Sequence, residues 1–217
     1  MSARPAAVVF DCDGLLIDSE VRWAVAERRV VEAHGGEWTE ELRERLVGGS
    51  GEHTAIRIAE WTGLSEESAP AILIDVYDSY LDVIQELGVD PMPGARSLVA
   101  ALAGRLPLAV ASNTREHMVR ATLTASGLPP VFEYVFSPSD ERRPKPAPDV
   151  YLAACTALGV SPSESIAFED SRPGMAAARA AGMYVIGVPS AGVHEADVDA
   201  DLVLGSLLDL DLADIGL

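Results

Sequence analysis

The sequence predicts an α/β fold with a doubly wound parallel sheet, into which a helical module is inserted. Short apolar runs rich in valine and isoleucine recur along the chain, and stretches of helical periodicity lie between the later runs. Strands that are apolar throughout are typical of parallel sheets covered by helices on both faces. The long segment after the first run has helical patterns only, which indicates the inserted module.

Six apolar runs, each bounded by polar or turn residues, are expected to form the strands. They are residues 7–10, 107–112, 131–136, 165–168, 183–188 and 201–204. Helices are expected between the later strands because each intervening stretch ends in a glycine, the residue that most often follows a helix. These helices are residues 114–127, 147–159 and 171–182.

The inserted module is expected to contain three helices, at residues 20–36, 52–63 and 65–88. The last is amphipathic, with five large side chains expected on one face: Leu73, Tyr77, Tyr80, Ile84 and Leu87. The chain is expected to return to the sheet near residues 91–95. We therefore predict an α/β core of residues 1–17 and 89–217 and a helical cap domain of residues 18–88.

The charge of the chain limits its partners. Thirty-four acidic residues against 16 basic ones give a net charge of −18, which disfavours nucleic acids and anionic membranes because both require a basic surface. Cys12 and Cys155 show neither metal-ligand spacing nor a disulfide framework. The first residues show no signal peptide, and no apolar run reaches membrane-spanning length. We expect a cytoplasmic protein, for which a monomer is plausible.

Polar residues follow or flank several predicted strands at one edge of the sheet. In parallel α/β sheets this edge, at the carboxyl ends of the strands, is where ligands bind. The residues expected there are Asp11, Asp13, Ser112, Asn113, Thr114, Lys145, Glu169 and Asp170. Each group alone is a weak signal, and their convergence on one edge predicts a site.

The chemistry of these residues fits a phosphorylated ligand and a divalent cation. Several carboxylates in one place favour Mg²⁺, which prefers oxygen ligands and substrate phosphate. Lys145 is the only lysine in the chain, and its ammonium suits a phosphate group. Aspartate can act as a nucleophile and form an aspartyl-phosphate. In an extended segment Asp11 and Asp13 point to the same side, so one can attack while the other transfers a proton.

Four segments, FDCDGLLIDS, ASNT, RRPKPAPD and FEDSRPGMAAARAAGM, resemble the four motifs of the haloacid dehalogenase superfamily. The likeness covers nearly the whole chain and is greatest to the subgroup of β-phosphoglucomutase and small-molecule phosphatases. It implies a Rossmann-like core, Asp11 as the nucleophile and Asp13 as the general acid and base. It also implies a helical cap that closes over the substrate.

The same resemblance assigns the remaining residues of the core. Ser112, Asn113 and Lys145 are expected to hold the phosphate. The expected Mg²⁺ ligands are Asp11, the backbone carbonyl of Asp13, Glu169 and Asp170, with Glu169 binding either directly or through water.

The activity expected from this site is Mg²⁺-dependent hydrolysis of a small phosphorylated metabolite, a sugar or polyol monophosphate, through an aspartyl-phosphate. The alternative is a phosphosugar mutase of the β-phosphoglucomutase type, whose cap carries a histidine, an arginine and a lysine. The matching positions here are Trp23, Gly51 and Asp82, which lack those cations and favour hydrolysis. Trp23 and Gly51 are candidate substrate contacts, and residues 47–53 are expected to influence substrate choice.

Two further activities are less consistent with these residues. A dehalogenase of this superfamily needs neither a metal nor a second acid, so Asp13, Glu169 and Asp170 argue against it. A binding module without catalysis would be expected to lack part of the first motif, which is complete here.

Overall fold

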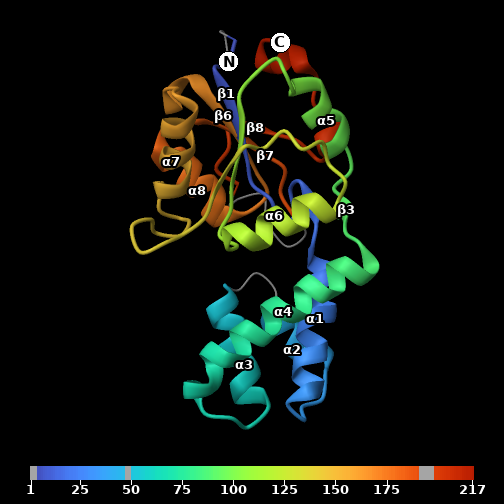
Figure 1. Cartoon of the computed structure of the whole chain (residues 1–217). Coiled ribbons are helices and arrows are strands. Elements are labelled where there is room, and N and C mark those ends of the chain that lie inside the picture. The colour runs from blue at the N-terminus through green and yellow to red at the C-terminus, as the bar shows by residue number, and fades with distance from the viewer. Residues whose placement is uncertain (1–3, 47–49, 191–197) are drawn as a thin grey trace. The chain divides into compact units, whose positions relative to one another are not determined.

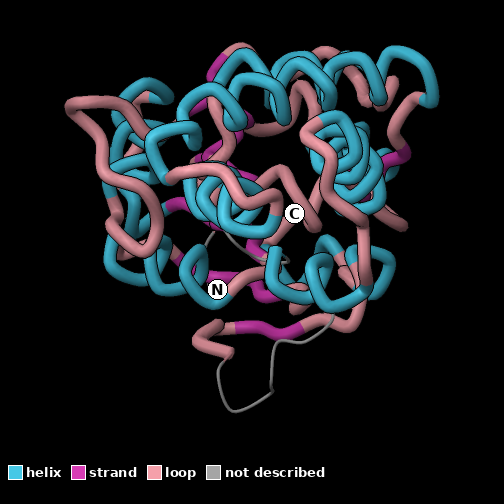
Figure 2. Tube along the Cα trace, turned by 90° about the horizontal axis from the view of Figure 1, so that it is seen from below, coloured by secondary structure: helices cyan, strands magenta, loops and turns pink. Residues whose placement is uncertain are grey.

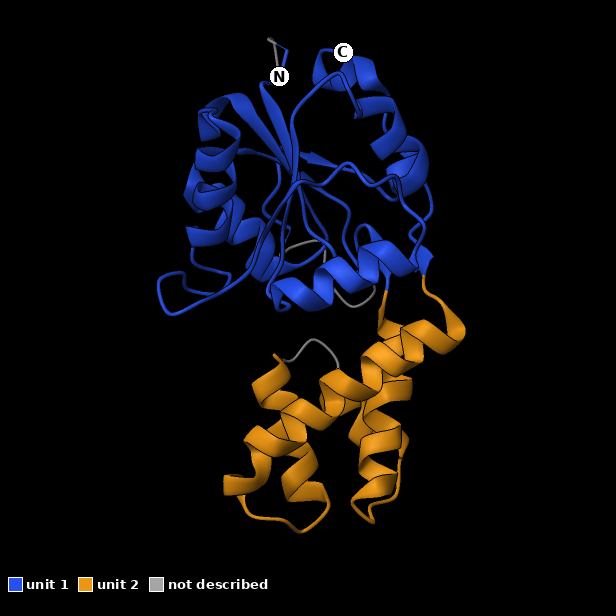
Figure 3. Ribbon diagram, viewed as in Figure 1, with its two compact units in different colours: residues 1–18, 90–217 blue, residues 19–89 orange. Residues whose placement is uncertain are grey.

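The computed structural model describes residues 4–46, 50–190 and 198–217. The chain divides into two units: Met1–Asp18 with Asp90–Leu217, here called the sheet unit, and Ser19–Val89, here called the helical unit (Figure 3). Each unit is described by itself, and the assignment of separate core and cap domains stays a prediction.

A six-stranded parallel sheet forms the centre of the sheet unit, in the spatial order β5-β4-β1-β6-β7-β8. This sheet confirms the predicted α/β fold class. The strands are β1 (Ala7–Phe10), β4 (Leu108–Ala111), β5 (Tyr134–Phe136), β6 (Ser165–Glu169), β7 (Tyr184–Gly187) and β8 (Leu202–Val203). All four residues of β1 are fully buried, as the continuous apolar run predicted.

The connections of the sheet reverse direction between β1 and β6, which are neighbours in the sheet. The chain leaves β1 towards β4 on one side and leaves β6 towards β7 on the other. The connecting helices are α5 (Ala95–Leu102), α6 (Glu116–Ala125), α7 (Asp149–Leu158) and α8 (Arg172–Ala181). Figure 1 shows α7 and α8 on one side of the sheet and α5 on the other. Such a reversal is where open α/β sheets bind ligands.

Helix α8 shows how local sequence sets the boundaries of these elements. Its N-cap Ser171 accepts a hydrogen bond from the backbone N–H of Gly174, and Gly182 follows the helix with a φ of 85°. In the described part of the chain, short 3₁₀ turns lie at η1 (Glu66–Ser68), η2 (Pro162–Glu164), η4 (Leu207–Asp209) and η5 (Leu212–Ile215).

Two strands and one helix of the sheet unit were not predicted. The strands β2 (Ile17–Asp18) and β3 (Asp90–Pro91) form an antiparallel pair where the chain leaves and re-enters the unit. Two residues are too few to show a periodicity. Helix α5 begins directly after Gly94, whose φ is 89°, at the point where the chain was expected only to return to the sheet.

The helical unit contains α1 (Glu20–Ala33), α2 (Glu40–Leu46), α3 (Gly51–Trp61) and α4 (Ala69–Leu87). Its core comprises Val30, Val31, Leu42, Leu46, Ala55, Ile58, Ala59, Ala69, Ile72, Leu73 and Val76. Helix α2 was not predicted. Leu87 was expected on the buried face of α4, but it is 54% exposed, because it is the last residue of the helix.

The described chain contains far more helix than strand (Figure 2). Even so, among the residues placed in the structure, no helix combines the length and the apolar character that crossing a membrane requires.

Burial of an acid in the helical unit predicts a pH-dependent stability. Burial raises the pKa of Glu27, on α1, to about 7, whereas an unfolded glutamate titrates near 4.3. Between these values the folded state binds a proton that the unfolded state does not, so stability falls as the pH rises. We expect Glu27→Gln to stabilise the protein at pH 8, by about 4 kcal/mol at most, and to have little effect at pH 4.

Urea denaturation at both pH values measures this effect. Glu44→Gln, at an exposed position of α2, is the control and should change little at either pH. Equal effects of Glu27→Gln at pH 4 and pH 8 would contradict the prediction.

Candidate active site

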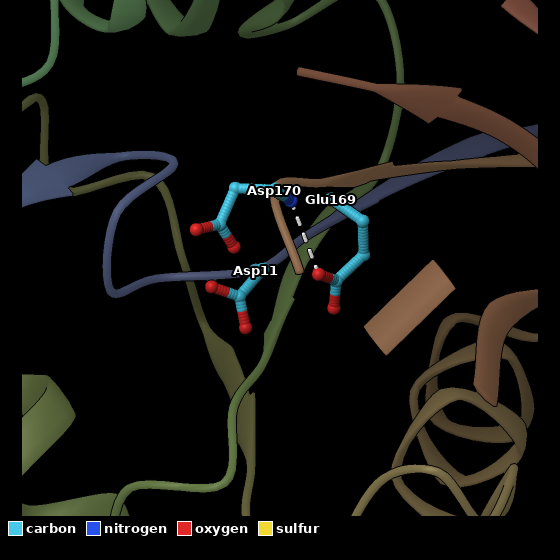
Figure 4. Close-up of side chains that lie close together, drawn as sticks. All are labelled: Asp11, Glu169 and Asp170. Carbon is cyan, nitrogen blue, oxygen red and sulfur yellow. Dashed lines mark hydrogen bonds between the residues drawn. The ribbon is translucent and has the colours of Figure 1, made fainter. Parts of the chain in front are cut away.

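The end of β1 brings the first predicted acid next to the end of β6. Asp11 directly follows β1 and is buried, and its backbone N–H donates to the carbonyl oxygen of Phe168 over 3.0 Å. Glu169 ends β6, and Asp170 follows it. Figure 4 shows the carboxyl groups of Asp11, Glu169 and Asp170 gathered at this place.

These three buried carboxyl groups form one cluster. Each offers an oxygen atom, and the three oxygen atoms lie within 4.8 Å of one another. The Nζ atom of Lys145 lies 2.5 Å from Asp11 Oδ1 and 2.5 Å from Glu169 Oε1. A single ammonium therefore faces three carboxyl groups, and the negative charge exceeds the positive charge.

The pKa values reflect this imbalance. Burial raises the pKa of Asp11 well above its usual range, although Lys145 opposes that effect. Burial, together with Glu169, raises the pKa of Asp170 to about 7. Burial lowers the pKa of Lys145, but Asp11 and Glu169 outweigh this and raise it above its ordinary value. The lysine is therefore a permanent cation, and the cluster favours a further one.

The cluster meets the requirements of a divalent cation. Asp170 Oδ1 is the buried side-chain oxygen for which the described residues offer no hydrogen-bond partner, and such an orphaned acceptor is rare in native structures. Oxygen donors of this kind suit Mg²⁺. The residues present therefore fit the expected ion.

Asp13 lies beside the end of β4. Its Oδ2 atom accepts a hydrogen bond from Thr114 Oγ1 over 2.8 Å and a longer one, 3.4 Å, from Ser112 Oγ. The Ser112 hydroxyl also accepts from the backbone N–H of Thr114 over 3.0 Å. The structure thus brings Asp13 and Ser112 together, and Thr114 orients both.

Asn113 contacts the segment that carries Lys145. Its Oδ1 accepts from the backbone N–H of Lys145 over 2.8 Å, and its Nδ2 donates to the carbonyl oxygen of the same residue over 3.3 Å. Both ends of the amide therefore position the lysine backbone, and direct contact of Asn113 with phosphate stays a prediction.

The two candidate substrate residues of the helical unit meet around Tyr77 of α4. The Trp23 and Tyr77 rings lie 6.2 Å apart, edge to face. A Cβ atom at Gly51 would lie 2.5 Å from the Tyr77 hydroxyl. Asp82 is exposed near Arg29 of α1. Of the segment 47–53 that was expected to influence substrate choice, residues 47–49 lie outside the described residues.

Three residues of the site received no role from the sequence. Thr114 bonds to Asp13, Tyr151 donates to Glu169 over 2.6 Å, and Gly174 lies against the Glu169 carboxylate. Thr114 was expected at this edge of the sheet, but no role was assigned to it there. Tyr151 and Gly174 belong to ordinary helical patterns, and the sequence contains no signal for their contacts.

The chain is similar to known proteins in both sequence and fold. The protein-family model of the haloacid dehalogenase-like hydrolases matches residues 5–182 of this chain. The validoxylamine A 7'-phosphate phosphatase of Streptomyces hygroscopicus subsp. limoneus is 31% identical, over 96% of this chain and 97% of that protein. The fructose-1-phosphate phosphatase YqaB of Escherichia coli is 30% identical, over 87% and 98%.

A solved structure is similar over almost the whole length. It is that of CbbY from Rhodobacter sphaeroides in complex with phosphate, with a TM-score of 0.84 and 29% identity, over 98% of this chain and 100% of that chain.

Proposed function

The chain belongs to the haloacid dehalogenase-like hydrolases, as its motifs indicated, and we propose that it hydrolyses a sugar or polyol monophosphate in a Mg²⁺-dependent reaction through an aspartyl-phosphate. Like its relatives, the protein is a phosphoric monoester hydrolase that acts on small phosphorylated metabolites. The phosphates named for two of those relatives are validoxylamine A 7'-phosphate and fructose 1-phosphate.

The observation that carries the proposal is the pairing of a buried Asp11 with the ammonium of Lys145, 2.5 Å away, beside a second aspartate that is held separately. A nucleophilic carboxylate must be ionised, and Lys145 favours that form against the effect of burial. Lys145 and the Ser112 hydroxyl can also donate to the oxygen atoms of a phosphate group.

The reaction follows in two steps. Asp11 attacks phosphorus to form the aspartyl-phosphate, while Asp13 donates its proton to the leaving oxygen. Asp13 then accepts a proton from water, which attacks the intermediate and releases phosphate. The hydrogen bond from Thr114 to Asp13 keeps the carboxyl group in one orientation for both transfers.

Mg²⁺ would bind at the cluster that Asp11, Glu169 and Asp170 form. Bound there, the ion would stabilise the negative charge that develops on the transferring phosphoryl group.

Hydrolysis is favoured over the mutase reaction by the surroundings of Gly51. A mutase of this family holds a second phosphate with cations from its helical module. Here Gly51 lies against the Tyr77 hydroxyl and Trp23 lies against the Tyr77 ring, and these side chains carry no positive charge. The Asp82 carboxyl lies near Arg29 instead, so the expected comparison of Asp82 with a mutase lysine gains no support from its position.

The proposal is tested by measuring phosphate release from a panel of metabolites, with Mg²⁺ and with excess chelator. The panel contains hexose, pentose and polyol monophosphates, phosphoglycolate, nucleotides, and β-glucose 1-phosphate with its bisphosphate. We expect release from sugar or polyol phosphates that stops with chelator and returns when Mg²⁺ is restored.

Two outcomes would contradict the proposal. Conversion of β-glucose 1-phosphate to the 6-phosphate without release of phosphate would identify a mutase. Full activity after exhaustive chelation would exclude the dependence on Mg²⁺.

A further inference from the structure

The Glu169 carboxylate is saturated by hydrogen-bond donors of the protein itself. Its Oε1 atom accepts from Lys145 Nζ over 2.5 Å and from the Tyr151 hydroxyl over 2.6 Å. Its Oε2 atom accepts from the backbone N–H groups of Asp170 and Ser171 over 3.2 and 3.3 Å, and from Ser171 Oγ over 3.1 Å. A carboxylate offers about four lone-pair sites, so five donors leave none for a cation.

The backbone of α8 also encloses this carboxylate. A Cβ atom at Gly174 would lie 2.0 Å from both carboxylate oxygens of Glu169 and from the carbon between them. No real Cβ makes such a contact, so the first turn of α8 accommodates the carboxylate only because residue 174 is glycine. Glu169 is fully buried, and it has no free space on this side into which it could turn.

Asp170 differs from Glu169 in its hydrogen bonding. Its Oδ1 atom is buried and has no hydrogen-bond partner among the described residues. Its Oδ2 atom lies 2.5 Å from the place of a Cβ at Gly14, whose φ of 82° also favours glycine. The neighbouring loop thus lies close to Oδ2, as α8 lies close to Glu169, whereas the Oδ1 atom remains available as a ligand.

Tyr151 connects Glu169 to the catalytic lysine. It lies in the first turn of α7, is fully buried, and donates its hydroxyl to Glu169. Lys145 Nζ lies over this ring, 5.0 Å from its centroid, a distance at which an ammonium is attracted to an aromatic ring. One side chain therefore holds both partners of the Lys145–Glu169 ion pair.

We propose that Glu169 does not bind the metal directly but, held by Tyr151, acts as a positioning residue for Lys145, and that Asp11 and Asp170 supply the carboxylate ligands. The inference rests on the proposed function and assigns a separate role to each of the three acids in the cluster. Lys145 contacts both Asp11 and Glu169, and Tyr151 holds Glu169 in place. Loss of the Tyr151 hydroxyl should therefore displace the ammonium from Asp11 without removing a metal ligand.

The test separates binding of the metal from the rate of reaction. Mg²⁺ affinity is measured by titration calorimetry without substrate, and phosphate release, inorganic phosphate affinity and thermal stability are measured in parallel. The variants are Tyr151→Phe, Glu169→Gln and Asp170→Asn. Tyr184→Phe is the control, since Tyr184 begins β7 at the opposite edge of the sheet from the site.

We expect Asp170→Asn to weaken Mg²⁺ binding by at least about tenfold. Glu169→Gln removes a neighbouring charge but no ligand, so it should weaken binding less than Asp170→Asn does, and Tyr151→Phe, which removes no charge, should leave binding nearly unchanged. Tyr151→Phe should nevertheless lower kcat by about 10- to 100-fold and weaken phosphate binding, because Lys145 is less well held. Tyr184→Phe should match the parent in every measurement. A role of Tyr151 in folding alone would lower thermal stability and leave kcat unchanged.

Three results decide against parts of the proposal. If Glu169→Gln weakens Mg²⁺ binding as much as Asp170→Asn does, Glu169 is a direct ligand. If Glu169→Gln does not fold, an equal loss of Mg²⁺ binding in Tyr151→Phe would lead to the same conclusion. An unchanged kcat in Tyr151→Phe would remove its positioning role. A parent protein that neither binds nor requires Mg²⁺ would instead overturn the proposed function, and the kcat of Tyr151→Phe would still test Tyr151.

Discussion

Asp11→Asn is expected to lower phosphate release by about 10⁴-fold or more, the scale of loss seen when a covalent nucleophile is removed. The amide has the shape of the carboxylate but cannot attack phosphorus. Burial penalises the charged form of Asp11 and raises its pKa, and Lys145 keeps its ion pair with Glu169 in the variant, so an uncharged side chain should cost little stability. The variant should therefore be folded and inactive.

Initial rates with the best substrate of the panel measure this loss, and thermal denaturation verifies the fold. Asp209→Asn, at an exposed position of η4, is the matched control and should retain full activity. If Asp11→Asn keeps a tenth of the parent rate or more, Asp11 is not the nucleophile.

Lys145→Met should reduce both stability and activity. The substitution leaves Asp11 and Glu169 buried without the ammonium that lies 2.5 Å from each. Loss of one partner of a buried ion pair typically costs about 3–5 kcal/mol. Phosphate release should become undetectable, because the same ammonium is the proposed contact for the phosphate group.

The loss of stability should depend on pH. Lys145 lowers the pKa of Asp11, so in the variant that pKa rises further and the carboxyl group is more readily protonated. Protonation removes the unpaired charge, so the destabilisation should be smaller at pH 5 than at pH 8. Urea denaturation in metal-free buffer at both pH values measures it.

Lys145→Arg is the matched variant, since it keeps the charge. A guanidinium is larger and planar and does not replace a compact ammonium in a closed site, so we expect stability to recover more than activity. Equal destabilisation by Lys145→Met at both pH values, or none at all, would show that the ion pair does not have the assigned effect.

The sequence predicted the fold best where the physics is local or repetitive. The run at residues 7–10 forms β1 with the expected bounds, because a strand buried on both faces must be apolar throughout. Prediction was poorer at short elements: β5 begins at Tyr134 rather than at residue 131, and β2 and β3 are two residues each. Such elements depend on pairing with a partner strand, which no window of sequence records.

The candidate site divides in the same way. Asp11, Asp13, Ser112, Lys145, Glu169 and Asp170 could be selected because each follows a strand or lies in a motif, and the carboxyl ends of parallel strands share one edge. The contacts of Tyr151 and Gly174 with Glu169 could not be selected. They join residues on different elements, and in the sequence both have the character of ordinary helix residues.

The sequence by itself determined the fold class and the set of chemical groups at the end of the sheet, since hydrophobic periodicity and residue type carry that information. Only the tertiary structure decided which hydrogen bonds each of those groups makes. It saturates one carboxylate, Glu169, with five donors and leaves an oxygen of its neighbour Asp170 without a partner. Two adjacent acids differ in this way because burial and hydrogen bonding act through space, on atoms that the chain brings together only when it folds.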